Sequence, residues 1–193
     1  MRVIAGSRRS IPLTAPPGKD VRPTTDRIKE TLFNIIAGML PGARFLDLFA
    51  GSGQIGIEAL SRGAETAVFV DNDPQAIRCI EANLAKTRFS EMAKVYRKNV
   101  SAALDTLRGQ EAFDLIFLDP PYQMDGQEVL LAQIGRMGIL AEHGVLILEA
   151  GLKREFPSEA LLPLICTREK TYKTNKHLFF TYDHETSDLS GQL

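Results

Sequence analysis

Residues 47–56 read Asp-Leu-Phe-Ala-Gly-Ser-Gly-Gln-Ile-Gly, and this stretch decides the fold of the chain. Its first residues end an apolar segment at 45–49, which predicts a buried β-strand, and its last residues begin a predicted helix at 53–61. The pattern GxGxxG between a strand and a helix lets the backbone approach a ligand closely and presents the free N–H groups of a helix N-terminus. The stretch therefore predicts a ligand site directly after the first strand.

The alternation of strand and helix continues on both sides of this loop. Further strands are expected at 66–70, 95–99, 113–118 and 145–148, and two final strands at 164–172 and 177–182. Such alternation predicts an α/β fold with a parallel sheet that helices cover on both faces. Ligands of these folds bind at the carboxyl ends of the strands, so the chemistry is expected after Phe49, Val70, Lys98 and Leu118.

Length and composition fit one compact domain. The chain has 193 residues, of which 44% are apolar, and it contains no apolar run near the roughly 20 residues that a membrane span needs. No apolar leader is visible after Met1, so a soluble cytoplasmic protein is expected. Cys79 and Cys166 form no CxxC motif and are interpreted as buried thiols without a role. The three histidines do not cluster with cysteines, so no metal is expected.

Charge is unevenly distributed along the chain. The net charge is −1, but seven Lys/Arg and three acidic residues give the first 30 residues +4 and leave −5 for the rest. A second basic group follows near the end, at Arg168, Lys170, Lys173 and Lys176. Such patches can contact phosphates, although a solvated surface explains them equally well. Both interpretations of the N-terminal cluster remain open.

Three polar residues near the predicted strand ends indicate which ligand the loop holds. Asp71, twenty residues after Gly51, can accept hydrogen bonds from ribose hydroxyls, which suits either a dinucleotide or S-adenosylmethionine. Asp47 favours S-adenosylmethionine, because a carboxylate there can face the ammonium of a methionine moiety but would repel a pyrophosphate. Asn99 stands where a side chain can contact adenine. The alternatives are a carboxylate bonded to loop amides at Asp47, a helix cap at Asp71 and a turn residue at Asn99.

Asp119-Pro120-Pro121-Tyr122, after the fourth strand, is the most specific motif in the chain. Prolines lack N–H groups, so they hold a rigid projecting turn whose carbonyl oxygens can accept hydrogen bonds. The Asp119 carboxylate and the Pro120 carbonyl can bind the two hydrogens of an exocyclic amine and direct its lone pair at a methyl donor. Tyr122 offers a ring on which a base can stack. The alternative is an ordinary turn that closes a buried strand.

With these motifs, the chain resembles the class I amino-methyltransferases, and Arg2-Val3-Ile4-Ala5-Gly6 and Arg22-Pro23-Thr24-Thr25-Asp26-Arg27 make it similar to the RsmD family. That family methylates the N2 amine of one guanine in 16S ribosomal RNA. The resemblance implies a seven-stranded, mostly parallel Rossmann-like sheet with an antiparallel last strand and an N-terminal hairpin. It implies domain limits of 1–22 for a basic RNA-facing hairpin and loop, 23–183 for the methyltransferase domain and 184–193 for a polar tail.

The resemblance also implies the site, its cofactor and its partner. Expected to act on the target amine are Asp119, Pro120, Pro121 and Tyr122. Expected to hold S-adenosylmethionine, which leaves as S-adenosylhomocysteine, are Asp47, Phe49, Gly51, Ser52, Gly53, Asp71, Asn72 and Asn99. Expected to face 16S rRNA, within small-subunit particles, are Arg2, Arg8, Arg9, Arg22 and Thr24. No membrane and no obligate protein partner are expected. Asn99 departs from the family, where many members carry aspartate, and Tyr122 is phenylalanine in some.

Three other functions stay open. An adenine-N6 or cytosine-N4 methyltransferase acting on DNA uses the same four-residue motif, but a base in a duplex must be flipped out and the chain leaves no room for a large recognition domain. A nicotinamide-dependent oxidoreductase fits the glycine loop and Asp71 but leaves Asp119-Pro120-Pro121-Tyr122 unexplained. A non-catalytic RNA-binding assembly factor would keep the fold without the reaction.

Overall fold

A computed structural model describes residues 1–16, 26–121 and 123–183 of the chain. Arg22, Thr24, Tyr122 and the tail at 184–193 lie outside the described residues. The elements are α1 (Asp26–Ile35), the 3-10 turns η1 (Ala37–Met39) and η2 (Ser90–Met92), β1 (Arg44–Leu48), α2 (Gln54–Ser61), β2 (Thr66–Asp71), α3 (Pro74–Thr87), β3 (Ala93–Arg97), α4 (Val100–Leu107), β4 (Phe113–Leu118), α5 (Gln127–Arg136), β5 (Leu140–Gly151), α6 (Ser158–Leu161), β6 (Leu164–Thr171) and β7 (Asn175–Tyr182).

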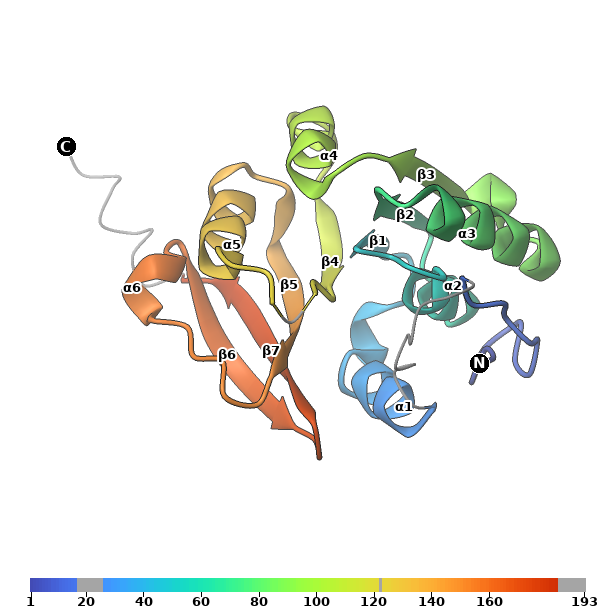
Figure 1. The fold of residues 1–193 in the computed structure, drawn as a ribbon, viewed down its shortest axis with the longest axis horizontal. Helices are drawn as coiled ribbons and strands as arrows, with labels where there is room; N and C mark the ends of the chain where they lie inside the picture. The colour runs from blue at the N-terminus through green and yellow to red at the C-terminus, as the bar shows by residue number, and fades with distance from the viewer. Residues whose placement is uncertain (17–25, 122, 184–193) are drawn as a thin grey trace.

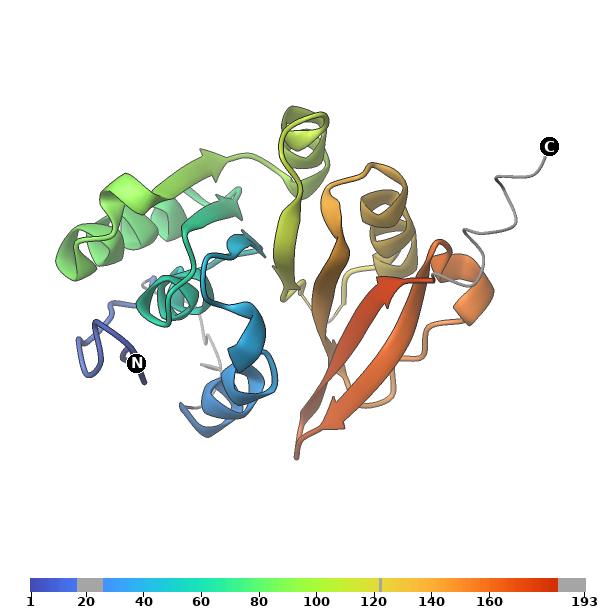
Figure 2. The same cartoon turned by 180° about the vertical axis from the view of Figure 1, so that it is seen from behind.

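The strands form one seven-stranded sheet in the order β3-β2-β1-β4-β5-β7-β6. β1 to β5 pair in parallel, whereas β7 is antiparallel to both β5 and β6. This is the predicted mostly parallel sheet with an antiparallel last strand. Figures 1 and 2 show the sheet crossing the molecule, with the N-terminal segment at one end and β6–β7 at the other.

Helices cover both faces of the sheet. Apolar side chains of α1, α2 and α3 pack on one face around Phe45, Phe69 and Phe117, and those of α4, α5 and α6 pack on the other. The central strands are buried on both faces, which is why 113–118 reads as a continuous apolar run. Within the described residues, no helix is long and apolar enough to span a membrane.

The N-terminal residues fold back on themselves and dock on α2. A single antiparallel bridge joins Arg2 to Pro12, and Ser10 N–H donates to the Val3 carbonyl at 2.9 Å. Gly6 has φ +82°, and a Cβ there would lie 1.8 Å from the Ser61 carbonyl oxygen, so only glycine allows this close approach. The pairing is too short to form named strands.

Three strand predictions were wrong in their limits by two residues or more. The last strand was expected at 177–182 but is Asn175–Tyr182. The third strand was expected at 95–99 but is Ala93–Arg97, because the Asn99 side chain caps α4 and the chain has already left the sheet. The fifth strand was expected at 145–148 but extends over Leu140–Gly151, because exposed Glu142 and His143 interrupt its apolar pattern without interrupting its extended backbone. Register shifts between Phe113 and Leu115 accompany this extension.

The prediction of two buried thiols was confirmed for Cys79 and was wrong for Cys166. Cys79 is buried in α3, but Cys166 is exposed. The reason is that Cys166 lies in β6, an edge strand whose side chains are exposed from Ile165 onward.

Candidate active site

The glycine loop turns sharply between β1 and α2. Phe49 has φ +63°, an unusual conformation for a residue with a side chain, and Gly53 with φ +75° is the N-cap of α2. The third glycine of the pattern, Gly56, instead allows α2 to pack closely against β2. A Cβ at Gly56 would lie 2.3 Å from the Phe69 ring, so α2 approaches β2 more closely than alanine would permit. The first two glycines therefore shape the loop, and the third seats its helix.

Asp47 is buried beneath this loop. Its side chain is 2% exposed, and its Oδ2 accepts a hydrogen bond of 3.0 Å from the Gly56 N–H. Burial raises the pKa of Asp47 to about 8, and the nearby Asp71 charge adds to the rise, while the Gly56 hydrogen bond opposes it. The structure thus gives Asp47 the amide partner that was the alternative interpretation. Its contact with an ammonium stays a prediction.

Asp71 ties the end of β2 to the loop. Its Oδ2 accepts from the Gly51 N–H at 2.9 Å, and its Oδ1 accepts from the Asp73 N–H at 2.9 Å. Each carboxylate oxygen has two lone pairs, so these bonds leave acceptor capacity for a ligand. The helix cap is a different residue, Asp73, whose side chain accepts from Gln75 N–H. Asp71 therefore fixes the loop and still borders the cavity described next.

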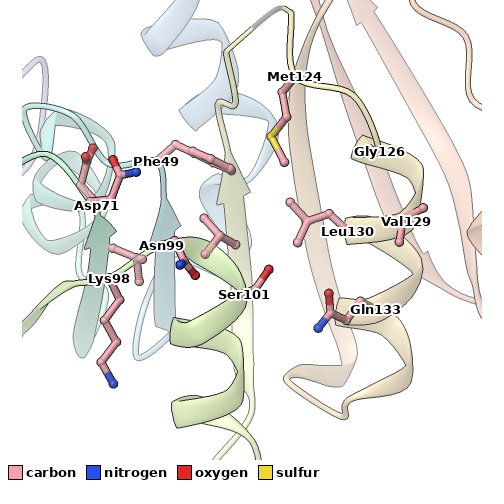
Figure 3. A pocket seen from close by; sticks show the side chains of 13 residues that line it. Phe49, Asp71, Lys98, Asn99, Ser101, Met124, Gly126, Val129, Leu130 and Gln133 are labelled. Carbon is pink, nitrogen blue, oxygen red and sulfur yellow. The ribbon is translucent and has the colours of Figure 1, made fainter.

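A cavity of about 290 Å³ opens at the carboxyl ends of β1, β2 and β3. Its walls are formed by Phe49, Val70, Asp71, Asn72, Lys98, Asn99, Val100, Ser101, Met124, Gly126, Val129, Leu130 and Gln133. In Figure 3, Asp71 and Asn99 come from one side and Met124, Leu130 and Gln133 from the other. The volume is near the lower end of the range for small-ligand sites, about 300 Å³. Apolar walls with a few polar groups at this size suit a nucleoside.

The cavity unites only part of the predicted cofactor residues. Phe49, Asp71, Asn72 and Asn99 line it. Gly51 is joined to it through the Asp71 hydrogen bond. Asp47, Ser52 and Gly53 are not among its walls, and Ser52 is instead buried with its carbonyl accepting from Asn83. Asn99 combines both interpretations, since it lines the cavity while its Oδ1 accepts from the Ala102 N–H at 2.8 Å.

Asp119 and Pro120 follow directly at the end of β4, between β1 and β5. The Pro121 carbonyl accepts from the Met124 N–H at 2.8 Å, which shapes the connection that carries Met124 into the cavity wall. Solvent can reach the Asp119 side chain, but the surrounding protein limits the hydration of its carboxyl group. This desolvation raises its pKa well above the ordinary range, and the charges of Glu149 and Asp47 raise it further. Perturbed carboxyl groups beside a cavity are typical of active sites.

Sequence reasoning missed two sets of residues at this edge. One is the far wall of the cavity, formed by Met124, Leu130 and Gln133, which no local pattern marks. The other is the polar group of Glu149, Asn175 and His177 behind Asp119. Glu149 carried a usable signal, because it closes an apolar strand as Asp119 does.

The arginines assigned to RNA differ in their surroundings. Arg2 is exposed and pairs with Asp26 at 3.1 Å. The Arg8 Nε donates to the Thr87 carbonyl at 2.7 Å, and its guanidinium lies 5.2 Å from the centre of the Phe89 ring. Arg9 is exposed. Arg8 thus anchors the N-terminal segment to the end of α3, whereas Arg9 is better placed to meet a partner.

A family model described as Conserved hypothetical protein 95 matches residues 1–181. The chain belongs to this family. The Bacillus subtilis (strain 168) protein named "Putative rRNA methyltransferase YlbH" is 44% identical over 173 residues, which cover 89% of this chain and 94% of YlbH. Ribosomal RNA small subunit methyltransferase D of Escherichia coli (strain K12) is 33% identical over 158 residues, covering 82% of this chain and 78% of that protein.

The solved structure of the Escherichia coli methyltransferase yhhF superposes on 95% of this chain and 98% of its own, with a TM-score of 0.79 and 30% sequence identity. Membership of Conserved hypothetical protein 95 thus agrees with the sheet order, and together they confirm a class I methyltransferase fold. In this member of an RsmD-like family, the cavity and Asp119 lie at the carboxyl end of the sheet, where α/β folds bind their ligands.

Proposed function

We propose that this chain transfers a methyl group from S-adenosylmethionine to the exocyclic N2 amine of a guanine in 16S ribosomal RNA. The observation that carries the proposal is the position of Asp119, Pro120 and Pro121 at the end of β4, beside a cavity of nucleoside size that the glycine loop borders. A nucleotide-like donor and a target amine would then meet at one edge of the sheet.

The cavity fits the adenosine part of the donor. Val70, Val100 and Leu130 offer apolar walls for a planar ring, and Asp71 offers carboxylate oxygens for ribose hydroxyls. Asp47, beneath the loop, is a buried carboxyl group that the charge of a bound ammonium would favour in its ionised form. When bound, S-adenosylmethionine supplies an electrophilic methyl group on a sulfonium.

In this reaction, the residues of the chain position the target amine and accept the proton that it loses. An exocyclic amine is a poor nucleophile, because its lone pair is delocalised into the base. Asp119 and the Pro120 carbonyl can accept its two hydrogens and hold the nitrogen with its lone pair toward the methyl group. The raised pKa of Asp119 makes its carboxylate a good acceptor for the proton that the methylated nitrogen must lose.

The relatives support ribosomal RNA as the substrate. YlbH is named as an rRNA methyltransferase, and the Escherichia coli relative as a small-subunit rRNA methyltransferase. Residues 1–16 carry Arg2, Arg8 and Arg9 and no acidic residue. Asn83 Nδ2 donates to the carbonyls of both Thr14 and Ser52, which joins this segment to the glycine loop. Such positive charge suits a phosphate backbone.

The test measures methyl transfer from labelled S-adenosylmethionine to unmodified small ribosomal subunits, free ribosomal RNA and DNA, followed by nucleoside analysis. We expect label in N2-methylguanosine with the ribosomal substrates alone. Asp119→Ala should abolish transfer while cofactor binding, measured by calorimetry, stays within about twofold, since about 0.4 kcal/mol corresponds to twofold. Asp105→Ala, an exposed aspartate of α4, is the matched control and should retain full activity.

Label in methyladenine or methylcytosine would overturn the substrate but keep the amine chemistry. Cofactor binding without label on any substrate would favour a non-catalytic RNA-binding role and contradict the proposal.

A further inference from the structure

A row of polar side chains crosses three neighbouring strands behind the candidate active site. Leu118 of β4 pairs with Leu148 of β5, so Asp119 and Glu149 follow at the next position of adjacent strands. Glu149 in turn pairs with His177 across the antiparallel β5–β7 ladder. Residues in register project from the same face of a sheet, so Glu149 and His177 lie on one face. Asp119 follows the last residue of β4 beside them, close enough for the Glu149 charge to act on it.

Both carboxylate oxygens of Glu149 have fixed partners. Its Oε1 accepts from Asn175 Nδ2 at 2.6 Å, and its Oε2 lies 3.2 Å from His177 Nε2. The His177 ring is fully buried, with Nδ1 3.2 Å from the Tyr172 hydroxyl and its edge against Phe117 at 6.0 Å between centroids. The Glu149 carboxylate is therefore held in one place by β7.

Packing alone does not explain this arrangement. Glu149 is 5% exposed, and a buried carboxylate with buried polar partners is expensive compared with an apolar side chain of similar volume. The neighbouring positions of β5 are apolar, so a leucine or isoleucine there would suit the fold. Buried carboxylates that cost stability are typical of functional sites, and the candidate active site lies one strand away.

We propose that Glu149, held by Asn175 and His177, is a positioning residue that acts through Asp119, its negative charge strengthening the attraction of Asp119 for the protons of the target amine. The inference rests on the proposed function, in which Asp119 receives that amine. Among the described residues, the charged groups that act on Asp119 are Glu149 from β5 and Asp47 from β1, both acidic. A negative neighbour makes the Asp119 carboxylate more basic and so a stronger hydrogen-bond acceptor.

The proton affinity of Asp119 can be measured without the reaction. Carbon-13 NMR of the aspartate carboxyl groups, with the Asp119 signal assigned by its loss in Asp119→Asn, gives the titration midpoint in the full chain. Glu149→Gln removes the charge but keeps the side-chain length, and we expect it to lower the midpoint by about one pH unit. Glu142→Gln is the matched control, because it makes the same change at an exposed position of the same strand, and it should leave the midpoint unchanged.

A second variant separates charge from folding. Glu149→Asp keeps the charge on a shorter stem, so its midpoint should return toward the wild-type value. Equal midpoints in wild type and Glu149→Gln, or a Glu149→Asp midpoint matching that of Glu149→Gln, would overturn the inference.

The pH dependence of methyl transfer gives an independent test of the role of Glu149. The acidic limb of the kcat profile should move to lower pH in Glu149→Gln by the shift that NMR reports, while the KM for S-adenosylmethionine stays unchanged. A limb that does not move, or an effect on KM alone, would contradict a positioning role. If the wild type methylates none of the substrates, the proposed function fails while the NMR titration still decides the inference.

Discussion

Asp47 shows how one residue can oppose stability and favour binding. Its pKa of about 8 means that the folded chain holds this proton more tightly than the unfolded chain, whose ordinary value is 3.8. Its contribution to stability is therefore complete below about pH 4 and is lost as the pH rises through about 8. A bound ammonium would reverse this penalty by giving the buried carboxylate a partner.

Asp47→Asn should raise the stability of the ligand-free protein and weaken cofactor binding. Asparagine keeps an acceptor for the Gly56 N–H but carries no charge to bury. We expect the melting temperature to rise at about pH 9 and to rise less at about pH 5. In a chain of this size, each kcal/mol of added stability raises the melting temperature by about 2 to 4 °C. Calorimetry should show S-adenosylmethionine binding weakened about tenfold, or about 1.4 kcal/mol.

Asp71→Asn serves as the comparison for this prediction, because it removes a carboxylate that contacts the same loop from a less buried position at the end of β2. A gain in melting temperature that is equal at both pH values would show that burial of the Asp47 charge is not its cause.

At the same scale, the sequence predicts where polar residues stand but not how they bond. Asp71 was placed correctly at the end of a strand, because the pattern of apolar runs determines where strands end, whereas Asn99 lies beyond the end of β3 as the N-cap of α4. Their bonds to the Gly51 and Ala102 amides depend on the torsion angles of the following loop, which residue types alone do not specify.

Among the elements, α1, α2 and the N-terminal segment meet at a buried ion pair. Lys29 and Glu58 are fully buried, with Lys29 Nζ 3.5 Å from Glu58 Oε2 and 2.6 Å from the Arg2 carbonyl oxygen. The N–H groups of Ile4 and Ala5 donate to the same carboxylate at 2.8 and 3.0 Å. Burial lowers the pKa of Lys29, while Glu58 opposes the shift. One carboxylate therefore joins three parts of the chain.

Lys29→Met should lower the free energy of unfolding by about 3 kcal/mol, because it removes one of the two cations that pair with the buried Glu58 carboxylate, the other being Arg62, and leaves the Arg2 carbonyl without its donor. Adding Glu58→Gln should restore part of this loss, since glutamine removes the buried charge and its carbonyl oxygen still accepts from one of the two N–H groups. Urea unfolding of both variants measures the difference. Lys86→Met, an exposed lysine of α3, should stay within about 0.5 kcal/mol of wild type. A double variant less stable than Lys29→Met would contradict this account.

This pair also marks a limit of sequence reasoning about elements. Helical spacing of apolar residues predicts α1, but a lysine within that pattern is expected to point to solvent. Only the docking of the N-terminal segment over α1 and α2 buries Lys29, and that contact joins residues 27 positions apart. The long β5 was underestimated for the converse reason, because exposed residues in an extended segment look like a loop.

For the whole molecule, the parallel topology explains why the edge of the sheet that carries the candidate site was predictable. Carboxyl ends of parallel strands share one edge, so motifs placed after β1, β2 and β4 must converge. The Glu149–His177 contact was not predictable, because it depends on β7 entering between β5 and β6 in the antiparallel sense. No local pattern encodes that pairing.

Charge at the molecular scale leads to a last prediction, on RNA binding by the N-terminal segment. Arg9→Glu should weaken binding to small-subunit rRNA about fivefold or more at 0.1 M salt and flatten the dependence of binding on salt, because fewer counterions are released. Filter binding across a salt series measures both effects. Arg136→Glu, an exposed arginine at the end of α5, is the matched control with the same change of net charge.

Arg8→Glu should differ from Arg9→Glu in one respect, because Arg8 also bonds to Thr87 and lies over Phe89. It should lower the melting temperature as well as RNA affinity, whereas Arg9→Glu should leave the melting temperature unchanged. If Arg9→Glu and Arg136→Glu weaken binding equally, the RNA responds only to the overall charge of the molecule. A loss confined to Arg9→Glu and Arg8→Glu would instead place the RNA backbone along the segment that the Asn83 hydrogen bonds attach to the glycine loop.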